Sequence, residues 1–142
     1  MTQSQLRVKD VMSRDVQVVG RNDQLAVADT LMKQARIRHL VVLDEDQLVC
    51  AVVSQRDLFR GALLRALGFG GRAEDSMLRQ MVVKEAMSGE LYTTTPDASV
   101  AEAARTMIDR KIGCLPVLDG EKLVGIVTET DFVELVAGGK PA

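Results

Sequence analysis

The feature that most constrains the fold of this chain is an internal repeat that fills nearly all of it. The sequence VKDVMS at residues 8–13 returns as VKEAMS at residues 83–88. LVVLD at residues 40–44 returns as LPVLD at residues 115–119, at the same offset of 75 residues (8 to 83, 40 to 115). The sequence therefore predicts two copies of one unit of about 60 residues each.

The closing part of each copy repeats as well, but the offset between the copies is one residue shorter. AVVSQRD at residues 51–57 returns as GIVTETD at residues 125–131, now at an offset of 74 (51 to 125). The first copy therefore has one extra residue in the turn at residues 44–47. In the second copy this turn is Asp119-Gly120, and glycine accepts the positive φ that a tight hairpin requires.

Each copy is expected to form the element order β-α-β-β-α. The short runs rich in Val, Leu and Ile are typical of buried strands, and apolar residues at helical spacing indicate the amphipathic helices. A strand is expected first, at 16–19 and 91–94, and then a helix, at 25–36 and 100–110. A hairpin and a closing helix that begins near Asp57 or Asp131 follow. Ser99 and Glu102 form a capping-box pattern at the start of the helix at 100–110.

The repeat sets the expected domain boundaries. The first repeat covers residues 6–67, and residues 83–137 form the second. The glycine-rich segment between them, residues 68–82, is expected to be a linker that can hold a short helix over 76–81. Residues 138–142 are expected to be a frayed tail.

Composition excludes several classes of function. The chain of 142 residues has a net charge of −2, 3% aromatic residues and no tryptophan, which gives no basis for binding a nucleic acid duplex or an anionic membrane. Cys50 and Cys114 make no disulfide framework, no cysteine and histidine have metal-ligand spacing, and both thiols are expected to be buried. The start of the chain does not read as a signal peptide and no apolar run approaches the ~20 residues of a transmembrane helix, so a cytoplasmic location is expected.

The tandem pattern resembles the CBS domain, named after cystathionine β-synthase, which normally occurs in pairs. The segments that match are the VKDVMS and VKEAMS openings, the LPVLD core of the second repeat, and the GIVTETDF and AVVSQRDL closings. The resemblance implies an α/β (α+β) fold in which two repeats pack through their sheets with pseudo-twofold symmetry. It also implies a homodimer formed through the helices, and a role in energy sensing through adenosine compounds such as AMP, ADP, ATP and S-adenosylmethionine.

The closing segments share the form [Ser/Thr]-x-x-Asp at the start of a helix. As capping boxes, Ser54 with Asp57 and Thr128 with Asp131 would satisfy helix N–H groups and contribute about 1 kcal/mol per cap. The same carboxylates could accept hydrogen bonds from ribose hydroxyls, and the cap hydroxyls and free helix N–H groups could face a phosphate. The two interpretations are compatible.

The resemblance implies two ligand sites, each with a ribose-binding aspartate from one repeat and base-contacting residues from the other. The preferred first site would consist of Thr128, Asp131, Val16, Gln17, Val18, Ile37, Arg38 and His39. Residues of the second site would be Ser54, Arg56, Asp57, Leu91, Tyr92, Thr93, Ile112, Gly113 and Cys114. Arg38 and His39 stand where the family often contacts phosphate, although an exposed strand start explains them equally well. At the second site Gly113 and Cys114 replace them, so a phosphate there would have to be bound by Arg56 or by a partner chain.

No catalytic pattern is present, so the chain is not expected to be an enzyme. The only histidine is His39, and the nucleophile, phosphate-loop and zinc-protease motifs are missing. No catalytic cofactor is expected, and an adenine nucleotide would act as a regulatory ligand. The regulated protein would be a separate chain, or this chain would be part of a longer one. The alternative is a ligand-free scaffold for dimerisation or protein interaction, in which the aspartates are helix caps only.

Overall fold

The computed structural model describes residues 6–66, 80–87 and 89–138. These residues form two compact units. The first-repeat unit consists of the described residues between 17 and 91. The second-repeat unit combines residues 6–16 with residues 92–138. The compact units thus divide the chain at other points than the sequence repeat, and the limits 6–67 and 83–137 remain a description of the sequence.

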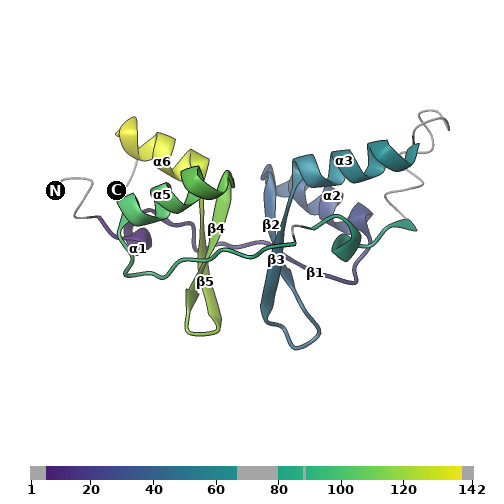
Figure 1. Ribbon diagram of the computed structural model, residues 1–142, viewed down its shortest axis with the longest axis horizontal. Helices are drawn as coiled ribbons and strands as arrows, with labels where there is room; N and C mark the ends of the chain where they lie inside the picture. Colours follow the sequence, from purple (N-terminus) through teal and green to yellow (C-terminus); the bar gives the residue numbers. More distant parts are fainter. Residues whose placement is uncertain (1–5, 67–79, 88, 139–142) are drawn as a thin grey trace. The chain divides into compact units, whose positions relative to one another are not determined.

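The first-repeat unit has a three-stranded sheet with two helices packed on it (Figure 1). Its strands run in the order β1-β2-β3, with β1 parallel and β3 antiparallel to β2. The elements are β1 (Val18–Gly20), α2 (Leu25–Ala35), β2 (His39–Leu43), β3 (Val49–Ser54), α3 (Gln55–Ala66) and the short 3-10 helix η2 (Val83–Glu85).

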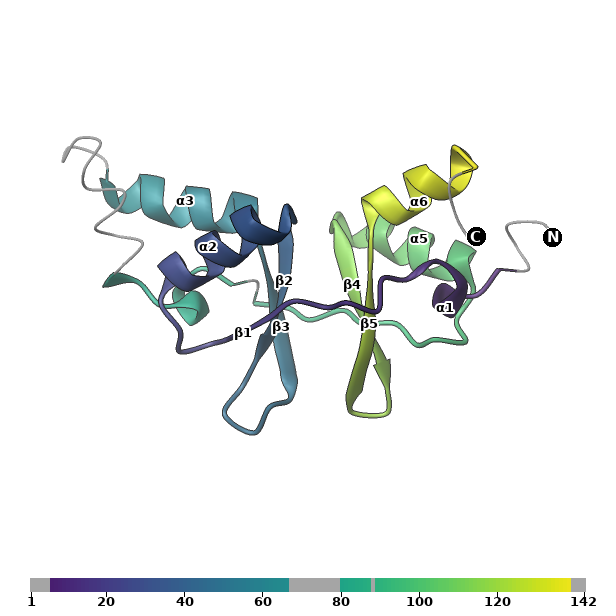
Figure 2. The same ribbon diagram turned by 180° about the vertical axis from the view of Figure 1, so that it is seen from behind.

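The second-repeat unit repeats this plan with a two-stranded antiparallel sheet, β4-β5, and the helices α5 and α6 beside it (Figure 2). Its elements are α1 (Val8–Val11), α5 (Val100–Arg110), β4 (Cys114–Asp119), β5 (Lys122–Thr128) and α6 (Glu129–Val136). Where the first unit has β1, this unit has a single parallel bridge between Thr94 and Val117.

The predicted order of elements is confirmed, but the first strand of each copy is shorter than expected. The strand expected at 16–19 covers Val18–Gly20, and the one expected at 91–94 is reduced to the bridge at Thr94. Apolar alternation indicates which residues can lie on a sheet, but only the residues that meet a hydrogen-bonding neighbour join the ladder. Most of the helix expected at 76–81, and most of the linker around it, lies outside the described residues.

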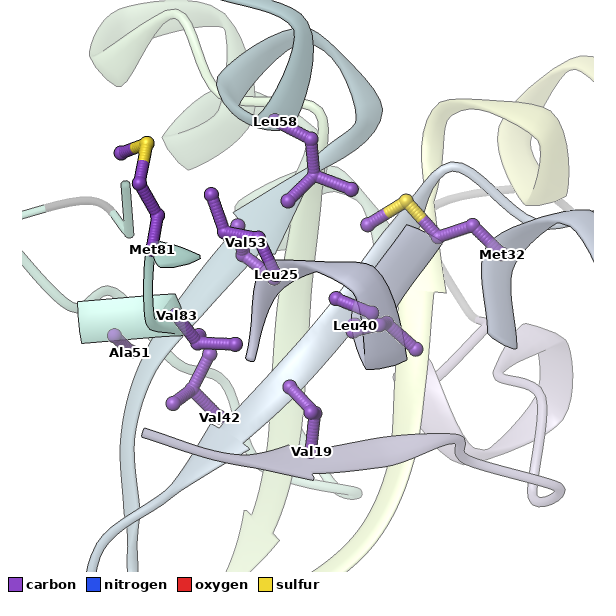
Figure 3. Close-up of a cluster of buried hydrophobic side chains, with 11 residues drawn as sticks. Val19, Leu25, Met32, Leu40, Val42, Ala51, Val53, Leu58, Met81 and Val83 are labelled. Carbon is purple, nitrogen blue, oxygen red and sulfur yellow. The ribbon is translucent and has the colours of Figure 1, made fainter. Parts of the chain in front are cut away.

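Each unit has its own hydrophobic core. The core of the first-repeat unit combines side chains of the sheet, of α2 and of residues beyond α3, among them Leu25, Leu40, Val53, Met81 and Val83 (Figure 3). A corresponding set, in which Val8, Val100, Leu115 and Val127 are buried, fills the second-repeat unit. The two sets share no residue, so each unit has a hydrophobic core of its own.

The opening segment of the first repeat packs on the second repeat. Val8 N–H donates to the carbonyl of Ala98 at 2.9 Å, and Val100 N–H donates to the carbonyl of Leu6 at 3.0 Å. The side chains of Leu6, Val8 and Val11 belong to the core of the second-repeat unit. These contacts explain why the compact unit joins the start of the chain to its last part.

The opening segment of the second repeat packs on the first repeat in the same way. Val83 N–H donates to the carbonyl of Asp23 at 2.8 Å, and Leu25 N–H donates to the carbonyl of Met81 at 2.9 Å. Each of these bonds is equivalent to one in the other unit, shifted by the 75-residue repeat. The repeats have therefore exchanged their opening segments.

The exchanged segment of the second-repeat unit closes against Gly125 in β5. Ser13 and Ile126 exchange two backbone hydrogen bonds of 2.9 Å each. A Cβ on Gly125 would lie 2.5 Å from Met12 Sδ and 2.9 Å from the carbonyl oxygen of Ser13. The close approach of the segment therefore requires glycine here, whereas the first repeat has Ala51 at the equivalent position.

Within the described ranges, no helix has the length and apolar character needed to span a lipid bilayer.

Candidate ligand-binding site

The helix cap of the second-repeat unit joins a hydroxyl and a buried carboxylate where β5 ends and α6 begins. Thr128 N–H donates to Asp131 Oδ2 at 2.8 Å, and Thr128 Oγ1 lies 3.5 Å from the same oxygen. Asp131 is only 5% exposed and is the one buried charged residue of the described chain. A carboxylate held in this way is fixed in direction, which suits both a cap and a ribose contact.

The first-repeat unit has the equivalent cap with a complete capping box. Ser54 N–H donates to Asp57 Oδ2 at 2.8 Å, and Asp57 N–H donates to Ser54 Oγ at 3.0 Å. Asp57 is half-buried, and its Oδ1 has no hydrogen-bond partner among the described residues. The predicted caps are therefore both present, and the carboxylate of Asp57 has one oxygen left for a further donor.

The segments that enter β2 and β4 lie directly beside these caps. Gln55 N–H, the first of α3, donates to the carbonyl of Arg38 at 2.8 Å. In the other unit Glu129 N–H donates to the carbonyl of Gly113 at 3.2 Å. Both segments follow a helix that ends in a left-handed residue, Arg36 or Lys111, each with φ of 56°.

The side chains in these entry segments differ between the units. Arg38 is exposed and His39 is half-buried beside Ile37, and His39 pairs with Ser54 across the β2-β3 ladder. In the second unit Ile112 and Gly113 are half-buried, and Cys114 is 2% exposed and pairs with Thr128. Polar groups for a ligand are therefore present at the start of β2 and missing at the start of β4.

The segments before the first strand present mostly apolar groups. Val16 and Gln17 are half-buried, and Val18 is 39% exposed at the start of β1. The equivalent residues are the half-buried Leu91 and Tyr92 and the exposed Thr93. The guanidinium carbon of Arg110 lies 4.9 Å from the ring centroid of Tyr92, a cation–π geometry.

Each unit brings together one part of each predicted site. The first-repeat unit contains part of both sites. From the first site it holds Gln17, Val18, Ile37, Arg38 and His39, and from the second it holds Ser54, Arg56, Asp57 and Leu91. The second-repeat unit contains the rest. From the first site it holds Val16, Thr128 and Asp131, and from the second it holds Tyr92, Thr93, Ile112, Gly113 and Cys114. The assembly of complete sites from residues of both units stays a prediction.

Two pKa shifts describe the electrostatics of the first-repeat unit. A hydrogen bond from Arg21 lowers the pKa of the Glu45 carboxyl to about 2, with Asn22 as a further donor. Desolvation raises the pKa of the Cys50 thiol, which keeps it protonated. Cys114 is buried as expected, whereas Cys50 is half-buried. Where the structure is described, no group of His, Cys, Asp and Glu could hold a metal ion.

Three residues near the site were not predicted from the sequence. Gln55 and Glu129 connect the caps to the entry segments through backbone bonds, which no side-chain pattern reveals. Arg110 stacks on Tyr92 from the last turn of α5. The only available signal was a cation in the last turn of a predicted helix, which the helix dipole explains without any site.

The chain is a tandem pair of α/β units, and each unit has a hydroxyl and a carboxylate at the end of its hairpin. These features define a pair of CBS domains. The family model of the CBS domain matches residues 8–63 and 83–138. The chain belongs to the CBS domain family, as its motifs indicate. CBS pair proteins are regulatory modules.

Similar proteins cover most of the chain. A CBS domain-containing protein of Bacillus subtilis, YhcV, is 32% identical over 88% of this chain and 81% of its own length. The structure of a Vibrio cholerae protein described as an acetoin utilization protein, AcuB, has 32% identity and a TM-score of 0.75, and the match covers 94% of this chain and 91% of that one. The CBS domain pair of protein MJ0100, in complex with 5′-methylthioadenosine and S-adenosyl-L-methionine, has 25% identity and a TM-score of 0.76, with 95% and 98% covered.

Other relatives are much longer than this chain. The chain spans 32% of an uncharacterized protein of Methanocaldococcus jannaschii and 24% of a homoserine O-acetyltransferase of Methanosphaerula palustris. The acetyltransferase match covers only the CBS part of that enzyme. Proteins that consist of CBS domains alone are generally regulatory.

Proposed function

We propose that the chain is a regulatory, non-catalytic module that binds an adenosine-containing ligand at sites formed by both repeats. The observation that carries the proposal is the pair of capped carboxylates, Asp57 and Asp131, each fixed by a backbone N–H at 2.8 Å. A carboxylate of fixed direction can accept hydrogen bonds from the vicinal hydroxyls of a ribose. The ligands of the MJ0100 pair, which both contain adenosine, support this choice of ligand class.

Thermal unfolding with AMP, ADP, ATP, S-adenosylmethionine and cyclic dinucleotides tests this proposal. A ligand at 100 times its Kd should stabilise the folded state by about 2.7 kcal/mol, which moves the melting temperature by several degrees. Titration calorimetry then gives the affinity and stoichiometry. If none of these compounds shifts the melting temperature or releases heat on titration, the proposal is refuted for them.

Two aspartate variants rank the sites. Asp131→Ala should abolish most of the ligand-induced shift, because the first site also has Arg38 and His39 for a phosphate. Asp57→Ala should remove less of it, because the entry segment facing the second site is the apolar Gly113 and Cys114. Equal losses in both variants would contradict this ranking.

A matched control separates loss of a helix cap from loss of a ligand contact. Ser99 caps α5 by accepting a hydrogen bond from Glu102 N–H at 3.0 Å, and it belongs to neither site. Ser99→Ala should lower the melting temperature of the free protein but leave the ligand-induced shift unchanged. If Ser99→Ala reduced the shift as Asp131→Ala does, the aspartate effect would reflect stability alone.

Exposed apolar side chains on the helices favour a second candidate function, the assembly of two copies. On α5 and α6, Ile108, Val133 and Val136 are 62%, 67% and 76% exposed, and Phe59 on α3 is 58% exposed. Side chains of this size gain free energy when a partner covers them. We therefore propose a homodimer formed through the helices, and light scattering at micromolar concentration tests it. A monomeric mass, or an unchanged dimer in Val136→Asp and Phe59→Asp variants, would refute it.

A further inference from the structure

The opening segment, residues 6–13, lies on a distinct surface of the second-repeat unit. We call this the receiving surface, and it consists of Pro96, Asp97, Ala98, Val100, Gly125 and Ile126. Lys9 N–H donates to the Pro96 carbonyl at 3.0 Å, and Ser13 exchanges two bonds of 2.9 Å with Ile126. The apolar side chains that the segment buries are Leu6, Val8, Val11 and Met12. These contacts depend on the sequence of the segment and would be the same if another copy of the chain supplied it.

The receiving surface selects the segment partly by charge. Lys9 Nζ lies 3.0 Å from Asp97 Oδ1, and Arg7 Nη1 donates to the Asp97 carbonyl at 3.3 Å. In the first-repeat unit the position equivalent to Asp97 holds Asn22, whose amide donates to Glu45 at 2.7 Å. A carboxylate that meets a segment lysine at this place is therefore a feature of the second-repeat unit alone.

The receiving surface also selects the segment by shape. Val11 is 1% exposed there, whereas the second opening segment has the smaller Ala86 at the equivalent position. Docking of residues 81–88 would therefore leave space where Val11 is buried, which costs free energy. Gly125 leaves room for Met12, whereas the first repeat has Ala51 at the equivalent position. The occupant that matches this surface is a segment with the sequence of residues 6–13, and each copy of the chain carries one.

The connection between the docked segment and β1 forms few bonds of its own. Arg14 and Asp15 are exposed, and residues 14–16 make no backbone hydrogen bond to another described residue. The segment can therefore leave with the connection as a hinge, and the contacts that it loses form again on a second copy. Such an exchange of identical elements is a low-cost route to a dimer. It competes with docking of the chain's own segment, whose effective concentration is on the order of 1 mM for a short connection.

We propose that the receiving surface of the second-repeat unit binds the opening segment of a second copy of this chain, so that two copies exchange segments and form a dimer. This dimer does not depend on ligand binding or on the exposed helix faces. Its partner is defined by a lysine opposite Asp97 and by the apolar side chains of residues 6–13.

Refolding at two concentrations separates this dimer from one formed through the helices. The Phe59→Asp/Val136→Asp protein, whose helix faces carry added charge, is refolded from urea at about 1 µM and at about 1 mM, and light scattering follows after dilution to one concentration. Only the concentrated sample should contain the exchanged dimer, because the second copy must outcompete the chain's own segment. If the concentrated sample contains only monomer, the inference is overturned, while the helix-mediated dimer and the proposed function stand.

A pair of charge reversals tests which surfaces meet. Lys9→Glu and Asp97→Lys each place like charges together within one chain. When the two variants are refolded together at about 1 mM, with one of them labelled with nitrogen-15, segment exchange restores an opposite-charge pair at both receiving surfaces. Native mass spectrometry should then show mixed dimers at about five times their statistical share, because an exposed ion pair changes an equilibrium about twofold and two pairs act together.

The matched control reverses an ion pair that lies within one helix. Lys33 and Asp29 pair at 2.9 Å along α2, away from the segment. Refolding Lys33→Glu together with Asp29→Lys should give mixed dimers at their statistical share. A statistical share for the Lys9→Glu and Asp97→Lys mixture as well would overturn the inference.

Shortening the hinge gives an independent test. Deletion of Arg14 and Asp15 removes about 7 Å of reach, so the chain's own segment competes less well for the receiving surface. The shortened protein, in the Phe59→Asp/Val136→Asp background, should be a dimer at micromolar concentration with the Ile126 amide still protected from hydrogen exchange. A shortened protein that stays monomeric, or a dimer in which the Ile126 amide exchanges freely, would overturn the inference.

Discussion

Gly125→Ala should destabilise the second-repeat unit by disturbing the exchanged segment that closes on β5. The new Cβ would lie 2.5 Å from Met12 Sδ, 3.0 Å from Met12 Cγ and 2.9 Å from the Ser13 carbonyl oxygen. The methionine tip can rotate away, but the carbonyl belongs to backbone. The segment must therefore move, and the two hydrogen bonds between Ser13 and Ile126 would lengthen.

The expected loss can be estimated from these contacts. Two weakened backbone hydrogen bonds cost about 1 kcal/mol each, and forcing a methyl into a packed site costs about 1–3 kcal/mol. Replacing glycine restores about 0.4–1 kcal/mol by restricting the unfolded chain. The net loss of unfolding free energy is about 2–5 kcal/mol, or roughly 1–2 M in the midpoint of urea unfolding.

Urea unfolding and amide hydrogen exchange measure this effect. Exchange of the Ile126 and Ser13 amides should accelerate most, because these groups lose their partners. Gly89→Ala is the matched control, since a Cβ there meets nothing within 4 Å. A midpoint for Gly125→Ala within error of the Gly89→Ala control, with the Ile126 amide still protected, would refute the reasoning.

Three further predictions concern stability. The hydrogen bond from Arg21 lowers the folded-state pKa of Glu45 from 4.5 to about 2, so the wild type should lose this stabilisation as pH falls from about 4.5 towards 2. In Glu45→Gln the midpoint of urea unfolding should change less with pH over that range than in the wild type. If the two midpoints change equally with pH in low salt, the lowered pKa is contradicted. Ser99→Ala should lower the unfolding free energy by about 1 kcal/mol in calorimetry, and no change would mean that the cap is not formed. Leu40→Ala and Leu115→Ala should each cost about 2–5 kcal/mol in urea unfolding, because both side chains are fully buried in equivalent cores. A loss below 1 kcal/mol in either would show that its site is not closely packed.

The repeat made most of the fold predictable from the sequence. Two copies of the same apolar pattern, each with turn residues at the same place, define the element order without any knowledge of the chain path. The caps were equally accessible, because Ser54 with Asp57 and Thr128 with Asp131 form a local pattern whose geometry depends only on nearby backbone. The α5 cap at Ser99 followed the same logic.

The exchange of opening segments could not be predicted in this way. Val8 and Val83 have nearly the same neighbours in sequence, and their acceptors, Ala98 and Asp23, occupy equivalent positions. Docking within a repeat and docking across repeats would therefore bury the same side chains and form the same bonds. The choice depends on chain length and direction, which local patterns do not contain.

The residues of the two candidate sites stay a prediction from the sequence, and the sequence does not show which of them share one compact unit. Arg38 and Arg56 were assigned to different sites, because the sequence does not show that Gln55 joins their segments.

The exchanged segments also determine when each core can be completed during protein synthesis. The core of the first-repeat unit needs Met81 and Val83, so it stays open until the ribosome has passed well beyond α3. Leu6 and Val8 leave the ribosome first but have to wait for Val100 and Leu115 before they can be buried. A chain that ends between the repeats would expose Leu6 and Val8, because the second-repeat core that buries them is absent. Its first-repeat core would also be incomplete, because Met81 and Val83 are absent. This first fragment and the complementary second fragment should each be unfolded alone, and both cores should form when the two fragments are mixed.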